Sequence, residues 1–284
     1  MKSYREIAGD GGSDVLGQVA ERSARLRARM APVATTLAVM SGKGGVGKSV
    51  VSANLAAALA TRARRVGVLD ADLNGPCLAR MLGVEGRRLK LGDDGIVPAE
   101  GPLGVKVVSM DLLLPESGSA LAWRAPAAQN QFAWRGMLEA TALAEFAGDT
   151  AWGELDFLLI DLPPGAERFA DLHDLLPACD KALVVTTPSG LAIASVRRSV
   201  ILARKLDARL LGAVENMAGL FAADGPAQAL GVPLLGSIPF DPRIAQCADR
   251  GLPFVSAHPD APAARAFAAL ADEIERRCTA EAAR

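Results

Sequence analysis

Nine residues near the start of the chain, SGKGGVGKS at 41–49, hold the side chains best suited to phosphate chemistry. Gly42, Gly47, Lys48 and Ser49 match the phosphate-loop pattern G-x-x-x-x-G-K-[ST]. Glycines lack Cβ atoms, so successive backbone N–H groups can turn inward around phosphate oxygens. Lys48 is then expected to contact the β- and γ-phosphates of ATP, and the Ser49 hydroxyl to bind Mg²⁺. In and beside this loop, the predicted nucleotide-binding set also includes Lys43, Gly44, Gly45, Val46 and Val50.

A second lysine, Lys43, lies five residues before Lys48 in the same turn. Its charge could simply be solvated at the loop surface. Alternatively, Lys43 has a role in catalysis. This is implied by a resemblance, because KGGVGKS closely resembles the variant phosphate loop of the deviant Walker A class of ATPases. In that class the extra lysine reaches across a dimer to the partner's nucleotide, where a second cation helps to neutralise charge that develops during transfer. The resemblance implies a homodimer in which Lys43 and Lys48 both act in catalysis.

Acidic and amide side chains close three of the apolar runs that follow. Asp70 and Asp72 end the second run, and Asp161 ends the fourth. A carboxylate beside a phosphate loop is well placed to hold the water shell of Mg²⁺, so Ser49, Asp72 and Asp161 are the predicted metal set. Asp72 could instead orient the attacking water, and a strand-end aspartate is often only a helix cap. Asn216 ends the sixth run, where its amide can donate to and accept from an adenine edge.

The apolar runs themselves predict the strands that position these residues. They are rich in Val, Leu and Ile without strict polar alternation, as in parallel strands covered on both faces. Segments with helical spacing separate most of them, beginning with Val51, Leu55 and Leu59. This alternation predicts a doubly wound, mostly parallel α/β sheet. The predicted strands are residues 35–40, 65–70, 105–110, 156–161, 181–187, 210–216 and 233–238.

The domain organisation predicted from these patterns is simple. Residues 33–284 are expected to form one P-loop ATPase domain. Residues 1–32 differ, because DVLGQVAERSARLRARM is a charged stretch with helical spacing. We expect residues 1–32 to form a helical lead-in, either packed on the domain or mobile.

Composition narrows the function classes. Of the 284 residues 50% are apolar and 22% charged, and the net charge of −1 gives no global attraction to nucleic acid or to an anionic membrane. No run of about 18 apolar residues predicts a transmembrane helix, and the opening MKSYREIAGDGGSD lacks the apolar stretch of a secretory signal. The four cysteines form no C-x-x-C pair, which fits reduced thiols in a cytoplasmic protein. They are Cys77, Cys179, Cys247 and Cys278.

Several further motifs, in order and spacing, make the chain resemble the Mrp-type ATPases, also called ApbC-like, from about residue 33 to 255. This resemblance implies a MinD/ParA-like fold and a dimeric, ATP-dependent scaffold or carrier that delivers iron–sulfur clusters to apoproteins. It also implies that Asp72 and Asp161 are switch carboxylates and that Asn216 contacts adenine. The motifs are SGKGGVGKS, LDADLNGP, WRGML (134–138), WGELDFLLIDLPPG (152–165), TTPSGLA (186–192), VENMAG (214–219) and GVPLLGSIPFDPRI (231–244).

Two departures from the family pattern stand out. Relatives usually carry a C-x-x-C pair soon after this Asn-Met, and one pair from each subunit bridges a [4Fe-4S] cluster. Here VENMAGLFAADGPAQALGVP contains no cysteine, and thiolates are the ligands that such a cluster requires. Relatives also have Thr-Gly-Asp after DLPPG, where this chain has Ala166, Glu167 and Arg168. We therefore predict a protein that binds ATP and lacks a stable bridging cluster, with hydrolysis slowed or differently coupled.

Two other function classes are weighed against a carrier-type ATPase. The alternative is a MinD/ParA-like positioning or regulatory ATPase, and one that positions other molecules would bind membrane or DNA. The apolar face of the tail, Phe267, Leu270 and Ile274, is better explained by core packing than by a membrane anchor, and the basic stretch at 22–30 has no aromatic residues for stacking on bases. A metabolic enzyme would need a further nucleophile or base near the loop. We expect partners among apo iron–sulfur client proteins or assembly factors, without nucleic acid or stable membrane association.

Overall fold

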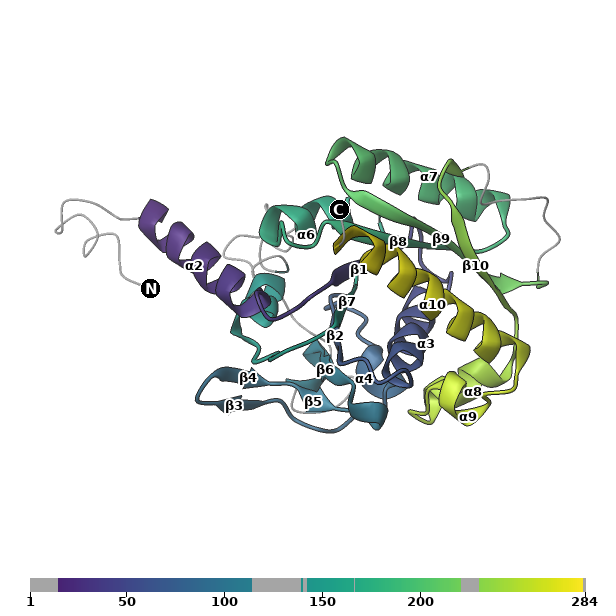
Figure 1. Ribbon diagram of the computed structural model, residues 1–284, viewed down its shortest axis with the longest axis horizontal. Coiled ribbons are helices and arrows are strands. Elements are labelled where there is room, and N and C mark those ends of the chain that lie inside the picture. Colours follow the sequence, from purple (N-terminus) through teal and green to yellow (C-terminus); the bar gives the residue numbers. More distant parts are fainter. Residues whose placement is uncertain (1–14, 114–138, 140–141, 166, 221–229, 283–284) are drawn as a thin grey trace, which may run out of the picture.

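A mostly parallel sheet forms the centre of the molecule (Figure 1). The computed structural model describes residues 15–113, 139, 142–165, 167–220 and 230–282. Within these ranges eight strands pair in the order β10-β9-β8-β1-β7-β2-β6-β5, and only β5 runs antiparallel to its neighbour. These strands are β1 (Thr36–Met40), β2 (Val66–Asp70), β5 (Ala99–Glu100), β6 (Lys106–Val108), β7 (Phe157–Asp161), β8 (Lys181–Thr186), β9 (Arg209–Ala218) and β10 (Leu234–Pro239).

Helices cover both faces of the sheet, and each face has its own apolar core. The first core joins one side of the strands to α3, α4, α9 and α10, and the second joins the other side to α2, α6 and α7. Alternate residues of β1 show the division, since Leu37 and Val39 enter the first core while Ala38 and Met40 enter the second. The helices are α2 (Val15–Met30), α3 (Lys48–Ala60), α4 (Leu78–Met81), α6 (Arg168–Leu175), α7 (Gly190–Lys205), α8 (Arg243–Asp249), α9 (Phe254–Ala257) and α10 (Pro262–Ala282).

This architecture confirms the predicted doubly wound α/β fold, and each of the seven predicted strands is present. The sequence patterns did not predict the short antiparallel edge strand β5. Nor did they predict a hairpin formed by β3 (Lys90–Gly92) and β4 (Gly95–Val97), whose residues are largely exposed. Short 3-10 turns at Pro102–Gly104 and Met110–Leu112 flank β6.

The two terminal helices pack on the domain in different ways. The end of α2 reaches the second core through Leu26 and Met30, which are 8% and 4% exposed, while its start extends away from the sheet (Figure 1). Along α10, Phe267, Leu270 and Ile274 are fully buried, so the predicted core packing of this apolar face is confirmed. None of the helices in the described ranges is long and apolar enough to cross a membrane. The division at residue 32 stays a prediction.

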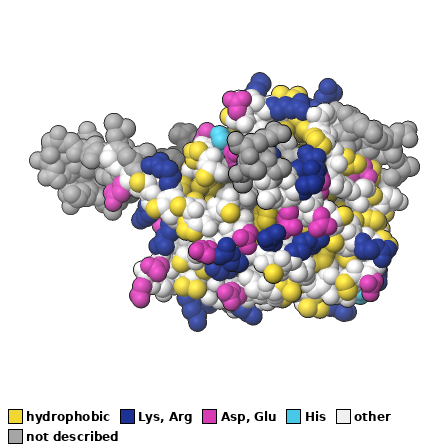
Figure 2. All heavy atoms as spheres, viewed as in Figure 1, with side chains coloured by type: hydrophobic (Ala, Val, Ile, Leu, Met, Phe, Trp, Pro, Cys, Tyr) yellow, Lys and Arg dark blue, Asp and Glu magenta, His cyan; other side chains and the backbone are white. Residues whose placement is uncertain are grey.

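The surface carries both charge signs. Figure 2 shows Lys and Arg side chains interspersed with Asp and Glu over the visible face, in keeping with the net charge of −1. Several of these charges pair between elements, as in the Arg62–Asp272 contact from the end of α3 to α10 at 2.9 Å. Such exposed pairs contribute little to stability.

Candidate nucleotide-binding site

The phosphate loop, residues 41–47, connects the carboxyl end of β1 to the start of α3. Gly45 and Gly47 have φ of 81° and 77°, a region that favours glycine. A Cβ atom at Gly47 would lie 2.2 Å from the side-chain nitrogen of Asn216. One at Gly42 would lie 2.4 Å from the backbone of Ser195 and Val196 in α7. The glycines therefore permit both the turn and its close packing against two neighbouring elements.

The loop borders a hollow of about 250 Å³. Both lysines, the motif serine and one of the predicted carboxylates share this hollow. Its position at the carboxyl end of the central strand is where open α/β sheets bind ligands. The lining residues are Ser41, Lys43, Gly44, Gly45, Val46, Gly47, Lys48, Ser49, Val50, Asp72, Cys77, Met81 and Pro164.

Lys48, Ser49 and Asp161 converge at the base of the hollow. Lys48 Nζ lies 2.5 Å from Asp161 Oδ2, with the two side chains 7% and 0% exposed. Ser49 Oγ donates to the same carboxylate oxygen at 2.5 Å, and Ser52 Oγ donates to Asp161 Oδ1 at 2.5 Å. Such partners offset the free-energy cost of burying a carboxylate. Ser52 was not predicted; only its spacing of one turn from Lys48 in α3 could have indicated it.

The two aspartates at the end of β2 and just beyond it, Asp70 and Asp72, lie in different surroundings. Asp70 is fully buried and accepts from the backbone N–H groups of Cys77 and Leu78, both at 3.0 Å, and from Ser109 Oγ at 3.2 Å. Burial, together with the nearby Asp161 carboxylate, raises the pKa of Asp70 to about 7. Asp70 thus anchors the start of α4, the capping alternative considered for a strand-end aspartate.

Asp72 instead lines the hollow. It is half-buried, and its Oδ1 accepts from the Gly75 N–H at 3.2 Å. This turn leaves the carboxylate facing the same space as Lys48 and Ser49. The arrangement suits either predicted role, holding the Mg²⁺ water shell or orienting a water.

Asn216, in β9, braces the phosphate loop. Its side chain is 4% exposed and Nδ2 donates to the Val46 carbonyl at 2.9 Å. The structure places the amide against the loop backbone, while the adenine contact stays a prediction. Lys43 is half-buried, lines the hollow and forms no ion pair within the described residues. Its carbonyl accepts from Ser41 Oγ at 3.1 Å.

The cysteines are dispersed through the fold. Cys77 lines the hollow, where burial and the Asp70 carboxylate raise the pKa of its thiol to about 11. Cys179 is fully buried in the second core, and burial raises the pKa of its thiol to about 12. Cys247 lies in α8 and Cys278 in α10. In the part of the chain that the structure describes, no group of three or more His, Cys, Asp and Glu residues could hold a metal ion.

Some sequence motifs fall outside the described residues. These are WRGML at 134–138, Ala166 and residues 221–229 of the segment after Asn216. Of the predicted site residues, the structure brings Lys43, Lys48, Ser49 and Asp72 to one hollow, with Asp161 directly behind it. The glycine loop presents backbone N–H groups for phosphate oxygens, and one hydroxyl and two carboxylates supply oxygen ligands of the kind that Mg²⁺ prefers. The residues present therefore fit a magnesium-bound nucleotide.

This fold and loop define a P-loop nucleoside triphosphatase of the MinD/ParA-like class. Among solved structures, the chain is similar to a nucleotide-binding protein from Archaeoglobus fulgidus in complex with ADP, with 33% identity, a TM-score of 0.66, and coverage of 81% of this chain and 92% of that one. It is also similar to the cell division ATPase MinD of Pyrococcus furiosus, with 29% identity, a TM-score of 0.65, and coverage of 86% and 100%.

Sequence comparison names the family. The profile described as "ParA: NUBPL iron-transfer P-loop NTPase" matches residues 32–275, and the chain belongs to this family. An iron–sulfur cluster carrier protein of Saccharolobus solfataricus is 39% identical over 272 residues, which cover 90% of this chain and 88% of the relative. The cytosolic Fe-S cluster assembly factor NUBP2 of Bos taurus is 38% identical over 264 residues, which cover 86% and 93%.

Proposed function

We propose that this chain is a homodimeric, magnesium-dependent ATPase that acts in cytoplasmic iron–sulfur cluster assembly or delivery. The observation that carries the proposal is the convergence of Lys48, Ser49 and Asp161 at the base of a glycine-lined hollow, in a family described by iron transfer. The named relatives support the assembly role, and the bovine one is a cytosolic factor.

The reaction proposed is attack of water on the γ-phosphorus of ATP, with cleavage of the bond to the bridging oxygen and release of ADP and phosphate. The loop N–H groups and Lys48 bind the phosphates, and Ser49, Asp72 and Asp161 hold Mg²⁺ and its waters. When bound, Mg²⁺ neutralises charge on the phosphate oxygens. Lys48 is expected to turn from Asp161 to the phosphates, which frees the carboxylate for its role at the metal. Orienting the attacking water is the alternative role proposed for Asp72, which lines the hollow.

Lys43 completes the site from the partner subunit in this proposal. Within the described residues it has no ion-pair partner of its own, and it lines the hollow. In the proposed dimer this cation neutralises charge on the neighbour's nucleotide during transfer. Hydrolysis would then depend on dimerisation.

We propose the role in iron–sulfur cluster assembly or delivery without a cluster that bridges two copies of this chain. The segment that carries the cysteine pair in relatives has none here, and four thiolates normally hold such a cluster. Cys179 is too deeply buried to replace them. The other three cysteines lie in different parts of the fold, Cys77 beside the hollow, Cys247 in α8 and Cys278 in α10. Apo iron–sulfur proteins or other assembly factors are the proposed partners, and ATP turnover is the proposed driver of their exchange.

Calorimetric titration with a non-hydrolysable ATP analogue tests the nucleotide site. Lys48→Ala should weaken magnesium-dependent binding about 10- to 100-fold, because a hydrogen bond to a charged group is worth about 1.5–3 kcal/mol. Lys205→Ala, at the exposed end of α7, is the matched control and should bind as the wild type does. Equal affinity of Lys48→Ala and the control would place the nucleotide elsewhere.

A transfer assay tests the assembly role. Under anaerobic conditions, an apo-ferredoxin and a cluster donor are mixed with the chain and MgATP, and cluster appearance on the acceptor is followed. Wild type should accelerate transfer and Lys48→Ala should not. A positioning ATPase is the second candidate, on the strength of the MinD likeness at 29% identity. It predicts no acceleration, and ATP-dependent binding to anionic vesicles instead.

A further inference from the structure

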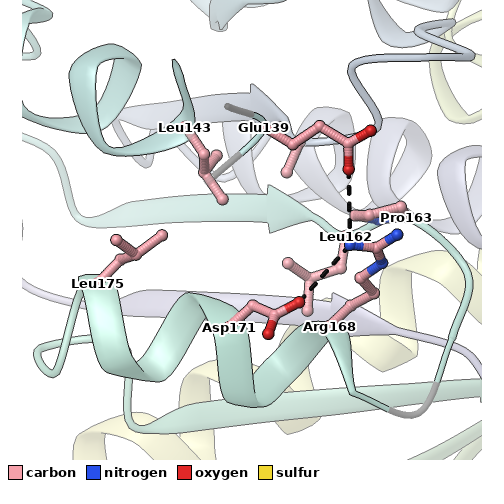
Figure 3. A pocket seen from close by; sticks show the side chains of 8 residues that line it. Glu139, Leu143, Leu162, Pro163, Arg168, Asp171 and Leu175 are labelled. Carbon is pink, nitrogen blue, oxygen red and sulfur yellow. Dashed lines mark ion pairs between the residues drawn. The ribbon is translucent and has the colours of Figure 1, made fainter. Parts of the chain in front are cut away.

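Polar contacts link the loops that follow β2 and β7, outside the phosphate loop itself. Asn74, in the loop after β2, donates through Nδ2 to Glu139 Oε1 at 2.7 Å. Glu139 Oε2 lies 3.6 Å from Nη1 of Arg168, the first residue of α6. Figure 3 shows Glu139 pointing at Arg168 beside Pro163, with Arg168 also turned toward Asp171. One acidic side chain thus connects the two loops.

Both loops carry residues of the proposed ATPase site. Asn74 follows Asp72 by two positions, and Arg168 follows Asp161 by seven. Where the strands end, the Ala71 N–H still donates to the Asp161 carbonyl at 3.0 Å. The contacts through Glu139 continue this link beyond the sheet, so the loop with Asp72 is tied to the loop with Asp161.

The surroundings of Arg168 indicate a held side chain. Arg168 is 31% exposed and Glu139 12% exposed. A second ion pair joins Arg168 Nη1 to Asp171 Oδ2 at 3.6 Å, and Arg168 Nε is buried without a hydrogen-bond partner among the described residues. The adjoining hollow measures about 30 Å³, far below the volume of about 300 Å³ or more of a ligand pocket. The cluster is therefore no separate binding site.

We propose that Arg168, acting through Glu139, is a positioning residue that holds the Asp72 loop against the Asp161 loop for hydrolysis. It stands where relatives usually have the aspartate of Thr-Gly-Asp, so the bridge is a feature of this chain's departure from that pattern. The inference rests on the proposed ATPase function. Arg168 does not line the nucleotide hollow, so it acts on the geometry of Asp72 and Asp161 and not on the phosphates.

Steady-state kinetics separate positioning from binding. Arg168→Met keeps much of the side-chain stem and removes the charge, and should lower kcat about tenfold, since a misplacement of about 1 Å can cost about a hundredfold. Affinity for the ATP analogue should change less than about twofold, because Lys48 and Ser49 are untouched. Arg168→Lys should recover part of kcat. Arg62→Met, which breaks the exposed pair with Asp272, is the matched control and should keep wild-type kcat.

A double-mutant cycle tests the partner. Glu139→Gln should lower kcat like Arg168→Met, and the double variant should be no worse than either single one, because both remove the same contact. If instead the fold-losses of kcat in the two single variants multiply in the double variant, Arg168 acts without Glu139. An unchanged kcat in Arg168→Met would overturn the positioning role itself.

Hydrogen exchange gives a readout that needs no turnover. In the absence of nucleotide, Arg168→Met should speed amide exchange in residues 71–77 and leave residues 43–52 unchanged. Faster exchange across the whole domain, or none in 71–77, would contradict the bridge. If the wild type neither binds nor hydrolyses ATP while the exchange result holds, the proposed function fails and the bridge stands as a structural contact.

Discussion

At the scale of single residues, the ion pair between Lys48 and Asp161 explains most about the site. Both side chains are buried, and their charges lie 2.5 Å apart. Burying an ion pair carries a desolvation cost that its attraction only partly offsets, so stability alone is a poor reason for it. The pair is better explained by the proposed roles of its members, with Lys48 binding phosphate and Asp161 binding the metal.

Cys77 offers a residue-scale test of the hollow. The thiolate is the reactive form, and with a pKa of about 11 only about one thiol in a thousand is ionised at pH 8. Alkylation of Cys77 should therefore be slow at neutral pH and rise about tenfold per pH unit up to about pH 10. MgATP should slow it further, because Cys77 lines the hollow.

Mass spectrometry of the alkylated peptides resolves this site by site. Cys278 in α10 is the control, since it borders a different hollow beside the start of β1 and should react equally with and without nucleotide. Rapid labelling of Cys77 at pH 7, unaffected by MgATP, would be incompatible with its placement beside Ser49.

The sequence predicted the motif residues but not the residues that hold them in place. Lys48, Ser49 and Asp161 follow from a motif and from a strand end. Ser52 looks like any small residue inside a helix, and its contact with Asp161 spans 109 positions. Nor could spacing alone decide which of Asp70 and Asp72 faces the hollow, because that depends on how the chain turns after β2.

At the scale of elements, the phosphate loop is packed between α3 and α7. Ser195 Oγ, in α7, donates to the Gly42 carbonyl at 2.6 Å, and the backbone of α7 touches Gly42 so closely that no Cβ fits. The loop conformation therefore depends on the position of α7 as well as on the motif.

Gly42→Ala and Gly44→Ala form a matched pair of tests. A Cβ at Gly42 would meet backbone at 2.4 Å, whereas nothing lies within 4 Å of one at Gly44. Overpacking typically costs about 1–3 kcal/mol, so Gly42→Ala should lower the melting temperature by about 3–10 °C. Gly44→Ala should melt within about 1 °C of the wild type. Equal melting of both variants, measured calorimetrically without nucleotide, would refute the packing of α7 on the loop.

The main elements were predictable because their patterns are strong. Continuous apolar runs such as FLLID give strands buried on both faces, and the spacing of Val51, Leu55 and Leu59 gives the inner face of α3. The hairpin of β3 and β4 was missed because its strands are three residues long and largely exposed. Burial, the physical basis of the apolar pattern, is weak there.

At the scale of the whole molecule, the site is proposed to be complete only in a dimer. Mixing Lys43→Ala with Lys48→Ala protein tests this. In a mixed dimer one chain keeps an intact loop and its neighbour keeps the reaching lysine, so one competent site should form and ATPase activity should partly recover. With mixed dimers verified by native mass spectrometry, no recovery at any ratio would mean that Lys43 acts only within its own chain.

This chain combines a proposed nucleotide site, lined by the motif residues, with a segment after Asn216 that carries no C-x-x-C pair. One experiment tests the nucleotide site and the missing cluster together. The protein is reconstituted anaerobically with iron, sulfide and a magnesium-bound ATP analogue, and iron and nucleotide are counted per dimer. We predict about one nucleotide per chain, little absorbance in the visible thiolate-to-iron band, and far fewer than about four irons per dimer. A stable cluster at full iron occupancy, or a protein without nucleotide, would contradict this account.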